Sequence, residues 1–551
     1  MKKYALGLDY GTLSVRALFV DIETGEEAAT AVYEYPHGVM TETLPDGTAL
    51  PDNFALEHLQ DFVEGLEYVI TNGMKDGGIQ PEAVIGIGID VTTATMFPID
   101  EKGVPLYTYP EFAQHPQAWM KLWKHHGAIE MADRMLEVAK ERGESWLSYY
   151  GDWLSSELFM PKAVELAVKD PEVFERAYNI IEAADWLVWL LTGEMTRSAS
   201  LAGCNSPYRK DTGYPSKEYF KAVYPEAENI PDKLVGPVIP LGSCAGYLLP
   251  EMAKKLGLLP GTPVGAATLD SHAAVIGCGA SRVGDMVSAI GTTANSMLNA
   301  EEGPGIPGIY SAAPDANIPG LFGYEGGQNC VGDCLAWYVN NCVPTSYKEA
   351  AEAEGVNIHN YLQARAEKLK PGESGLVALD WFNGVRSPLM DYELTASIVG
   401  LTVCTKPEEI YRALVESIVF GNKRIIDTYE QAGCPVKRII AAGGIPMKNS
   451  MMMQIYADVC NQDIYLCGSP QASARGSAIL GAAAAGPEVY GCRDIYELVE
   501  KLGKMADLVY HPIPENVERY KKLYAVYKQL SDEMAKSDGV VKELLKLKKE
   551  L

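Results

Sequence analysis

The sequence lacks the features that would place a protein in a membrane or on a nucleic acid. No stretch approaches the roughly 20 apolar residues that a membrane-spanning helix needs, and Asp9 interrupts the first apolar run too early for a signal peptide. Basic residues are outnumbered, because 47 Lys and Arg face 73 Asp and Glu, a formal net charge of −26. Nucleic acids and anionic membranes attract basic surfaces, so we expect neither as a partner.

The chain also lacks the cysteine pattern of a disulfide framework. Its 11 cysteines are an odd number, are scattered from Cys204 to Cys492, and include no Cys-x-x-Cys pair. This usage indicates reduced, mostly buried thiols and a cytoplasmic location. Only Cys330 and Cys334 lie close together, and small core residues on a helix are favoured there over a metal or redox pair.

What the sequence does contain is a hairpin suited to phosphate. The 551 residues, 47% hydrophobic, suggest two large domains or three smaller ones. At the start, two apolar strands, Tyr4–Leu8 and Val15–Val20, flank a polar turn at Gly11. Such a turn presents backbone N–H groups to an anion, while the carboxylate of Asp9 suits the Mg²⁺ that accompanies nucleotide phosphates. An ordinary hairpin with a polar tip is the alternative.

A second stretch repeats this pattern about half a chain later. Residues 283–298 again read as strand, Gly-Thr turn and strand, and the pair Gly291-Thr292 matches Gly11-Thr12. A duplicated phosphate hairpin predicts two similar domains that face each other across a cleft and hold one nucleotide between them.

The remaining pattern is that of an α/β protein. Val84–Ile89 reads as a buried strand that ends at Asp90, either a sugar-hydroxyl acceptor or a simple loop cap. Asp270 follows a strand of small residues and either lines the cleft or caps a helix that begins at Ser271. Helices are predicted at 119–126 and 407–432 and in the stretch that Gly443–Asn449 opens, whereas 30–48 reads as irregular.

The order of these motifs resembles the FGGY carbohydrate kinases of the actin-like ATPase superfamily. One family signature is matched at Ala396-x-Ile398-x-Gly400-Leu401 and, after seven residues, at Glu409-Ile410-x-x-Ala413-Leu414-Val415-Glu416. The resemblance runs from about residue 3 to about 500. It also includes Ser155-Ser156-Glu157 with Lys162, Glu325-Gly326-Gly327-Gln328, Asp380–Gly384 and Gly443-Gly444-Ile445.

Within the family the chain is most similar to the ribulokinases, with departures. The letters Phe-Gly-Gly-Tyr do not occur, and the segment Ala202-Gly203-Cys204-Asn205 has Asn205 where ribulokinases usually carry a sugar-contacting lysine. Lys210 lies nearby in the sequence and is the candidate replacement. The departure weakens the assignment to L-ribulose in particular.

The resemblance implies an α/β fold of two actin-like (ribonuclease H-like) domains facing across a cleft. It places an N-terminal sugar-binding domain at 1–275, a C-terminal nucleotide-binding domain at 276–500 and a helical extension at 501–551. It implies an ATP- and Mg²⁺-dependent kinase, expected to be a homodimer, that phosphorylates the terminal hydroxyl of a ketopentose, L-ribulose in arabinose catabolism. The alternatives are a kinase for D-ribulose, xylulose or erythritol, and a non-catalytic actin-like ATP-binding protein.

The resemblance also assigns roles to residues. Asp270 is the expected general base, with Asp9 and Asp270 as the magnesium ligands. The expected sugar contacts are Asp90, Glu157, Asn205 and Glu325. The expected nucleotide contacts are Gly11, Thr12, Ser14, Arg16, Gly291, Thr292, Gln328, Gly443, Gly444 and Asn449.

Overall fold

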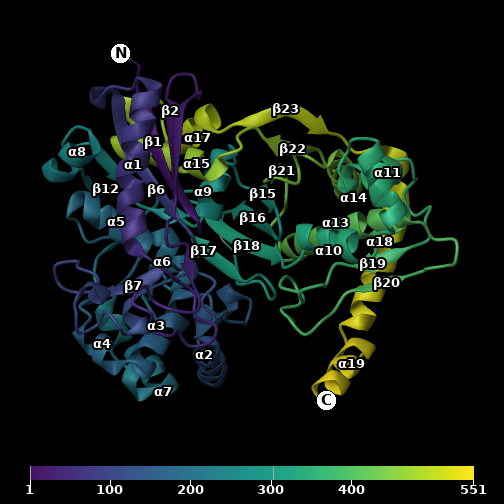
Figure 1. The fold of residues 1–551 in the computed structure, drawn as a ribbon, viewed down its shortest axis with the longest axis horizontal. Helices are drawn as coiled ribbons and strands as arrows, with labels where there is room; N and C mark the ends of the chain where they lie inside the picture. Colours follow the sequence, from purple (N-terminus) through teal and green to yellow (C-terminus); the bar gives the residue numbers. More distant parts are fainter. Residues whose placement is uncertain (1, 302, 551) are drawn as a thin grey trace.

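The computed structural model describes residues 2–301 and 303–550, which form two halves that each contain a central sheet (Figure 1). In the N-terminal half, β1 (Tyr4–Tyr10), β2 (Ser14–Asp21) and β3 (Glu27–Glu34) form an antiparallel meander, and β6 (Val84–Val91) adds to β1 in parallel. The sheet continues through β13 (Pro263–Gly265) to β12 (Cys244–Tyr247), and β14 (Thr268–Leu269) also pairs with β6.

The C-terminal half repeats this topology. The hairpin of β15 (Asp285–Ile290) and β16 (Ala294–Ala300) takes the place of β1 and β2, and β18 (Phe322–Gln328) takes that of β3. On the other side of β15 lie β21 (Arg438–Ala442) and β22 (Ile464–Cys467) in parallel, and β23 (Met505–Tyr510) and β17 (Ser311–Pro314) form the edges. The duplication predicted from the two Gly-Thr hairpins is therefore confirmed.

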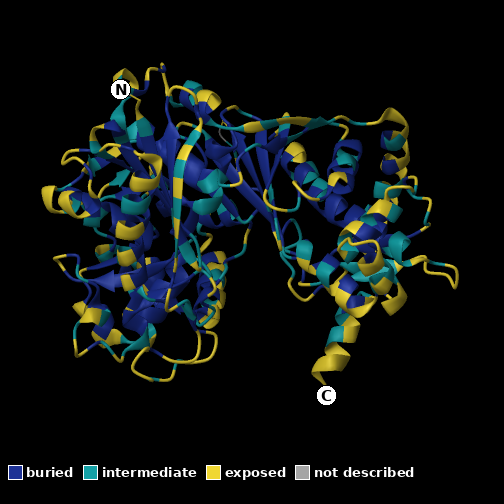
Figure 2. Ribbon diagram, turned by 45° about the horizontal axis from the view of Figure 1, so that its top comes forward, coloured by how far each residue is buried: buried dark blue, intermediate teal, exposed yellow. Residues whose placement is uncertain are grey.

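Helices cover both sheets, whose central strands are buried, while the edge strands β3 and β23 are partly exposed (Figure 2). Helix α1 (Leu59–Gly77) packs on β2 and β3, and α13 (Pro407–Gln431) and α14 (Ser450–Cys460) pack on the second sheet. Helix α18 (Pro514–Met534) lies outside them and contacts both α13 and α14. A final helix, α19 (Val540–Lys549), runs down the outside of the C-terminal half.

Helix α15 (Ala472–Ala485) joins the halves, because it packs on β1 and β6 of the first sheet and on α9 (Asp270–Gly277). Its close approach requires glycine: a Cβ at Gly88 would lie 1.9 Å from the carbonyl oxygen of Ser477, and one at Gly7 would lie 1.9 Å from that of Ala474. Glycines on the strands thus let a helix from late in the sequence rest directly on the first sheet.

A smaller subdomain completes the N-terminal half. Short strands β4 (Val39–Met40), β5 (Leu56–Glu57), β8 (Met120–Lys121), β7 (Met96–Ile99) and β9 (Asn179–Glu182) form one sheet. Beside it lie α2 (Ile129–Arg142), α3 (Phe159–Lys169), α4 (Pro171–Arg176) and α7 (Lys217–Val223). Helix α5 (Ala183–Thr192) packs on β6 and β12 of the first sheet, and α6 (Ala199–Asn205) contacts β14 and β17.

Two predictions of local structure were wrong. The segment 119–126 is not a helix, because Lys121 pairs with Leu56 of β5 and the chain continues without helical structure through Trp123. The start of the segment 30–48 is regular, since it belongs to β3. The helix that the stretch Gly443–Asn449 was predicted to open is present, by contrast, as α14, which begins at Ser450 with the Asn449 side chain as its cap.

Candidate active site

A cavity of about 360 Å³ lies between the two halves. Gly11 and Thr12, at the tip of the first hairpin, line one wall, and Thr293, at the tip of the second, lines the other. Asp270 also borders it. The predicted cleft between two similar domains is thus confirmed, and the tips of both hairpins face the same space.

Three carboxyl groups gather where β1, β6 and β14 end. Asp9 and Asp90 are opposite each other in the parallel register of β1 and β6, and Asp270 follows β14, whose Thr268 is paired with Asp90. Asp90 is fully buried beneath the cavity and does not line it; its Oδ2 accepts a hydrogen bond of 2.5 Å from Ser477 Oγ, while its Oδ1 has no partner among the described residues. The sheet therefore holds three acids together in the interior.

This crowding perturbs the ionisation of all three groups. Burial, followed by the charge of Asp9, raises the pKa of Asp270 to about 7. The same two causes raise the pKa of Asp90 well above its ordinary value. Burial also raises the pKa of Asp9, although Arg16, with its Nε 3.7 Å from Asp9 Oδ2, acts in the opposite direction. A cation placed among these groups would relieve both the burial of charge and the mutual repulsion.

In both hairpin turns the glycine N–H is bonded inside the turn, but to acceptors at different separations. The N–H of Gly11 donates to the carbonyl of Ser14, three residues on, at 2.9 Å, and the N–H of Gly291 donates to that of Thr293, two residues on, at 2.8 Å. Thr12 Oγ1 accepts a hydrogen bond of 3.1 Å from Trp123 Nε1, which fixes the first tip against the segment after β8. Thr292 is exposed beside the second tip, outside the cavity lining.

The predicted nucleotide turn lies beside the second hairpin. Gly443 is so close to β15 that an added Cβ would lie 2.5 Å from the carbonyl oxygen of Ile290, whereas Gly444 faces open space. Two other predicted contacts have their side chains engaged in the protein. Asn449 accepts from the N–H of Met452 as the cap of α14, and Gln328 Nε2 donates to Asp380 Oδ2 at 2.9 Å.

The other predicted sugar contacts do meet in the cavity. Glu157, Asn205 and Glu325 all line it. Asn205 is held by a hydrogen-bonded chain, in which Thr93 Oγ1 donates to Asn205 Oδ1 and Asn205 Nδ2 donates to Glu182 Oε2, both at 2.9 Å. Burial, followed by the charge of Asp185, raises the pKa of Glu182, the acceptor behind Asn205, to about 8.

Glu325 remains ionised despite its burial. Its Oε2 lies 3.2 Å from His272 Nε2. Burial favours the neutral acid, but the hydrogen bond and charge of His272, together with Tyr310 and Arg386, lower the net pKa of Glu325. Among the described residues that line the cavity, the carboxyl groups are therefore Glu157, Asp270 and Glu325, and the cationic side chain is Arg386.

A buried lysine supports the sugar side of the cavity. Lys162 Nζ donates to the carbonyl of Ala94 at 3.0 Å and to that of Leu122 at 2.9 Å, just before Trp123. Ala94 has φ 47°, an uncommon backbone conformation for a residue with a side chain. Burial lowers the pKa of Lys162 to about 7. Lys162, part of a family motif in the sequence, does not line the cavity itself. It holds two segments that border the cavity.

Several lining residues were not predicted from the sequence. Thr92 and Thr93 lie just past the end of β6, which is a place where cleft residues are expected. Trp123, Tyr310, Arg386 and Tyr392 lie outside regular elements, where periodicity gives no signal. For Arg386 the available signal was the motif Asp380–Gly384, which ends two positions before it.

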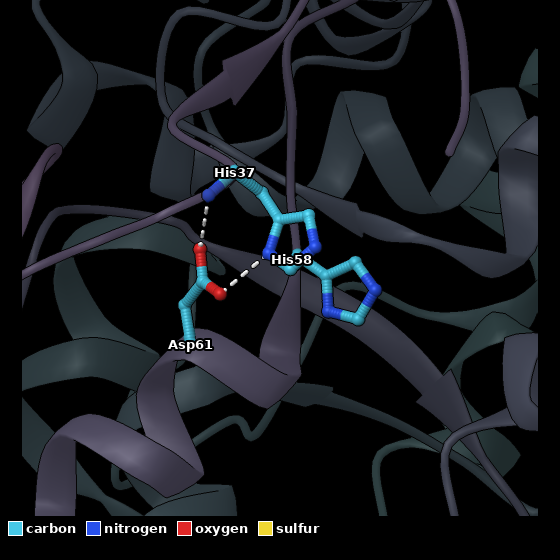
Figure 3. Close-up of side chains that lie close together, drawn as sticks. All are labelled: His37, His58 and Asp61. Carbon is cyan, nitrogen blue, oxygen red and sulfur yellow. Dashed lines mark hydrogen bonds and ion pairs between the residues drawn. The ribbon is translucent and has the colours of Figure 1, made fainter.

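A separate cluster of His37, His58 and Asp61 lies at the start of α1 and does not line the cavity (Figure 3). His37 Nδ1 lies 2.6 Å from Asp61 Oδ1, and the His37 N–H donates to Asp61 Oδ2 at 3.1 Å. His58 stacks on His37 and accepts the N–H of Gln60 as the cap of the helix. The polar atoms of this cluster are thus used in hydrogen bonds within the protein, and the cluster is separate from Asp9 and Asp270, the predicted magnesium ligands.

Comparison with known proteins decides the family. The model of the N-terminal domain of the FGGY family of carbohydrate kinases matches residues 4–277, and that of the C-terminal domain matches residues 286–485. The chain belongs to the FGGY carbohydrate kinases. The resemblance stated from the sequence is thereby confirmed, and the protein is an ATP-dependent sugar phosphotransferase.

Relatives match this FGGY kinase over its whole length. A ribulokinase of Geobacillus thermodenitrificans is 45% identical over 551 residues, which cover 100% of this chain and 98% of that protein. A ribulokinase of Bacillus licheniformis is 46% identical over 538 residues, or 97% and 98% of the two chains. The crystal structure of xylulose kinase from Rhodospirillum rubrum has a TM-score of 0.79 at 22% identity and covers 96% of this chain and 98% of that one, which shows the shared fold.

The FGGY kinase has no membrane-spanning candidate in the described part of the chain. None of the helices there combines the length and the apolar character that crossing a bilayer requires.

Proposed function

We propose that this FGGY kinase transfers the γ-phosphoryl group of ATP to the terminal hydroxyl of a ketopentose, with L-ribulose as the first candidate and L-ribulose 5-phosphate as the product. The proposal rests on the position of Asp270, a carboxyl group in a cavity bordered by both hairpin tips. The full-length similarity to proteins named ribulokinase supports the choice of sugar.

In the proposed mechanism Asp270 accepts the proton of the attacking hydroxyl. A pKa near 7 suits a general base at neutral pH, because the group is ionised in a large fraction of molecules and still binds a proton well. Phosphoryl transfer depends mainly on positioning and on stabilisation of charge. We assign the γ-side phosphates to Gly11, Thr12 and Ser14 with Arg16 behind them, and the β-side phosphates to Gly291 and Thr292.

The residues present fit a magnesium ion. Asp9 and Asp270 offer carboxylate oxygens, which Mg²⁺ prefers, and Asp90, opposite Asp9 in the strand register, has an Oδ1 without a partner among the described residues. We propose that Asp9, directly or through water, and Asp270 hold Mg²⁺, which when bound neutralises phosphate charge. In this proposal the carboxyl group of Asp90 contributes its charge to the magnesium site. It is not the sugar contact that the sequence suggested.

For the rest of the nucleotide we propose the turn Gly443-Gly444, whose open side leaves room for the adenosine. Asn449 and Gln328 support this region through their bonds to α14 and Asp380. We keep the proposed domain limits of 1–275, 276–500 and 501–551, although α15 packs on the first sheet. A homodimer in the cytoplasm remains part of the proposal, and size-exclusion chromatography with light scattering would test the dimer.

A second candidate is a kinase for another ketose or polyol, such as D-ribulose, xylulose or erythritol. Asn205 favours it, because a neutral amide bonded to Thr93 and Glu182 occupies the position where the sequence led us to expect a lysine. Lys210, the suggested replacement, is exposed and outside the cavity lining.

An ADP-coupled assay with a sugar panel separates these proposals. L-ribulose as the substrate with the highest kcat/KM supports the first candidate, and another ketose or polyol in that place supports the second. ATP turnover that no sugar stimulates would exclude both.

A further inference from the structure

Arg386 occupies an unusual position in the cavity wall. It belongs to segment 380–393, which follows β19 (Val377–Leu379) in the C-terminal half. Its guanidinium carbon lies 5.1 Å from the ring centroid of Tyr310. Within the described chain, the guanidinium forms no ion pair; the Tyr392 hydroxyl is its hydrogen-bonding neighbour, and Glu157 and Glu325 are the carboxyl groups whose charges act on it. A guanidinium carries five N–H donors in a planar fork, so Arg386 brings free donor capacity to the cavity.

The opposite wall provides acceptors but no cation. Glu157 and Asn205 come from the N-terminal half, and the lining that the structure describes includes no other Lys or Arg. An uncharged polyhydroxy ketone needs both donors and acceptors along its length. A pocket with Arg386 facing Glu157 and Glu325 provides them and disfavours a sugar acid, because the two carboxylates repel a third.

The loop around Arg386 is held by helices from the C-terminal extension. Val385 and Asp391 exchange backbone hydrogen bonds of 2.9 and 2.8 Å, which closes the loop on both sides of Arg386. On α19, Lys542 Nζ donates to Asp391 Oδ1 at 2.7 Å and to Glu393 Oε2 at 3.2 Å.

Two further contacts fix the same loop. On α18, Tyr527 donates its hydroxyl to Asp380 Oδ1 at 3.0 Å. The N–H of Ser387 donates to the carbonyl of Gly327 on β18 at 2.9 Å. The last two helices of the chain, α18 and α19, thus contact the loop that carries Arg386, and Figure 1 shows both helices beside β19, from which this loop continues.

We propose that Arg386 donates hydrogen bonds to oxygens of the bound sugar, and that α18 and α19 are positioning elements which hold its loop in place. This inference rests on the proposed sugar kinase function and deepens it. Because Arg386 comes from the C-terminal half while Glu157 and Asn205 come from the N-terminal half, a bound sugar ties the two halves together.

The first test compares wild type with Arg386→Gln and Arg386→Lys in the coupled assay, using the best sugar of the panel. A hydrogen bond from a charged donor contributes about 1.5–3 kcal/mol, so Arg386→Gln should raise the sugar KM by about ten- to hundredfold while the KM for ATP stays within about twofold. Arg386→Lys should rescue part of this loss. An unchanged sugar KM in Arg386→Gln overturns the inference alone, whereas a wild type that phosphorylates no sugar overturns the proposed function as well.

The second test concerns the positioning helices. Lys542→Ala should raise the sugar KM by about three- to tenfold in wild type but add nothing in the Arg386→Gln background, because it acts through Arg386. Lys546→Ala is the matched control, since it removes the same charge from the same helix, and the Lys546 side chain pairs with Glu543 on that helix, at 3.4 Å. Equal effects of Lys542→Ala in both backgrounds, or the same effect from Lys546→Ala, would contradict the positioning role.

Discussion

Replacement of Asp270 by asparagine tests the proposed base and has two separable effects. Asparagine keeps the size of the side chain but cannot accept the proton of the sugar hydroxyl, so kcat should fall by about 10²–10⁴. The KM for ATP should change little. In the wild-type enzyme, kcat/KM should decrease as the pH falls below about 7, because Asp270 is then protonated and cannot act as a base.

The second effect is on stability. The pKa of Asp270 is raised from its ordinary 3.8 to about 7, so the folded state binds the proton more tightly than the unfolded state does. The free energy of unfolding of wild type therefore decreases as the pH rises through this range and levels off above it. At about 1.4 kcal/mol per pH unit the limit is about 4 kcal/mol, but solvent in the cavity reduces this and we expect about 1–2 kcal/mol.

Asparagine removes this penalty, so Asp270→Asn should be more stable than wild type at pH 8, and the difference should shrink towards pH 5. Urea unfolding at both pH values measures it, and ADP-coupled kinetics measures the rate. Asp211→Asn, in an exposed loop, is the control and should change neither property. A variant that phosphorylates sugar at nearly the wild-type rate would show that Asp270 is not the base.

The remaining predictions concern packing, support and motion. Gly88→Ala should destabilise the fold by several kcal/mol in urea unfolding, because the new Cβ would lie 1.9 Å from the Ser477 carbonyl oxygen. Gly444→Ala places its Cβ in open space, so this variant should keep wild-type stability and raise the KM for ATP. Equal stability of the two variants would contradict the packing argument. Lys162→Met should cost about 2 kcal/mol of stability, because two interior carbonyls lose their hydrogen-bond donor, and an unchanged urea midpoint would contradict this. Sugar and ATP analogue together should compact the protein in small-angle scattering, because closure of the halves excludes water; an unchanged radius of gyration would count against closure.

Much of the fold could be predicted from the sequence because its strands, turns and helices produce patterns over short stretches of the chain. The hairpin strands are continuous apolar runs interrupted by a Gly-Thr turn, and the repeat of that turn gives the duplication. The long helix α13 shows the expected periodicity over 25 residues. Segment 119–126 was misjudged because its pairing partner, β5, is more than 60 positions earlier in the chain, and such distant pairings leave no local signal.

The candidate site was predictable where its residues end strands, and not where they lie on loops. Asp9 and Asp270 each come at the end of an apolar strand, at the sheet edge where a cleft forms. Their places in the sequence therefore predicted that both carboxyl groups lie beside the cleft. Asp90 shares that edge, but its burial under α15 depends on glycines that allow a helix from 472–485 to approach, which no local pattern reveals. Arg386 reaches the cavity through a loop fixed by α19, a contact between segments more than 150 residues apart.

The most direct test of the proposed reaction is to identify which product carries the phosphoryl group of ATP. Wild-type protein is incubated with Mg²⁺, ATP and L-ribulose, and the products are examined by ³¹P nuclear magnetic resonance with proton coupling, with D-ribulose, xylulose and erythritol in parallel. The account predicts one equivalent of ADP for each phosphomonoester formed on a terminal methylene carbon of a sugar. Release of ADP together with inorganic phosphate, and no sugar phosphomonoester from any of these compounds, would contradict it.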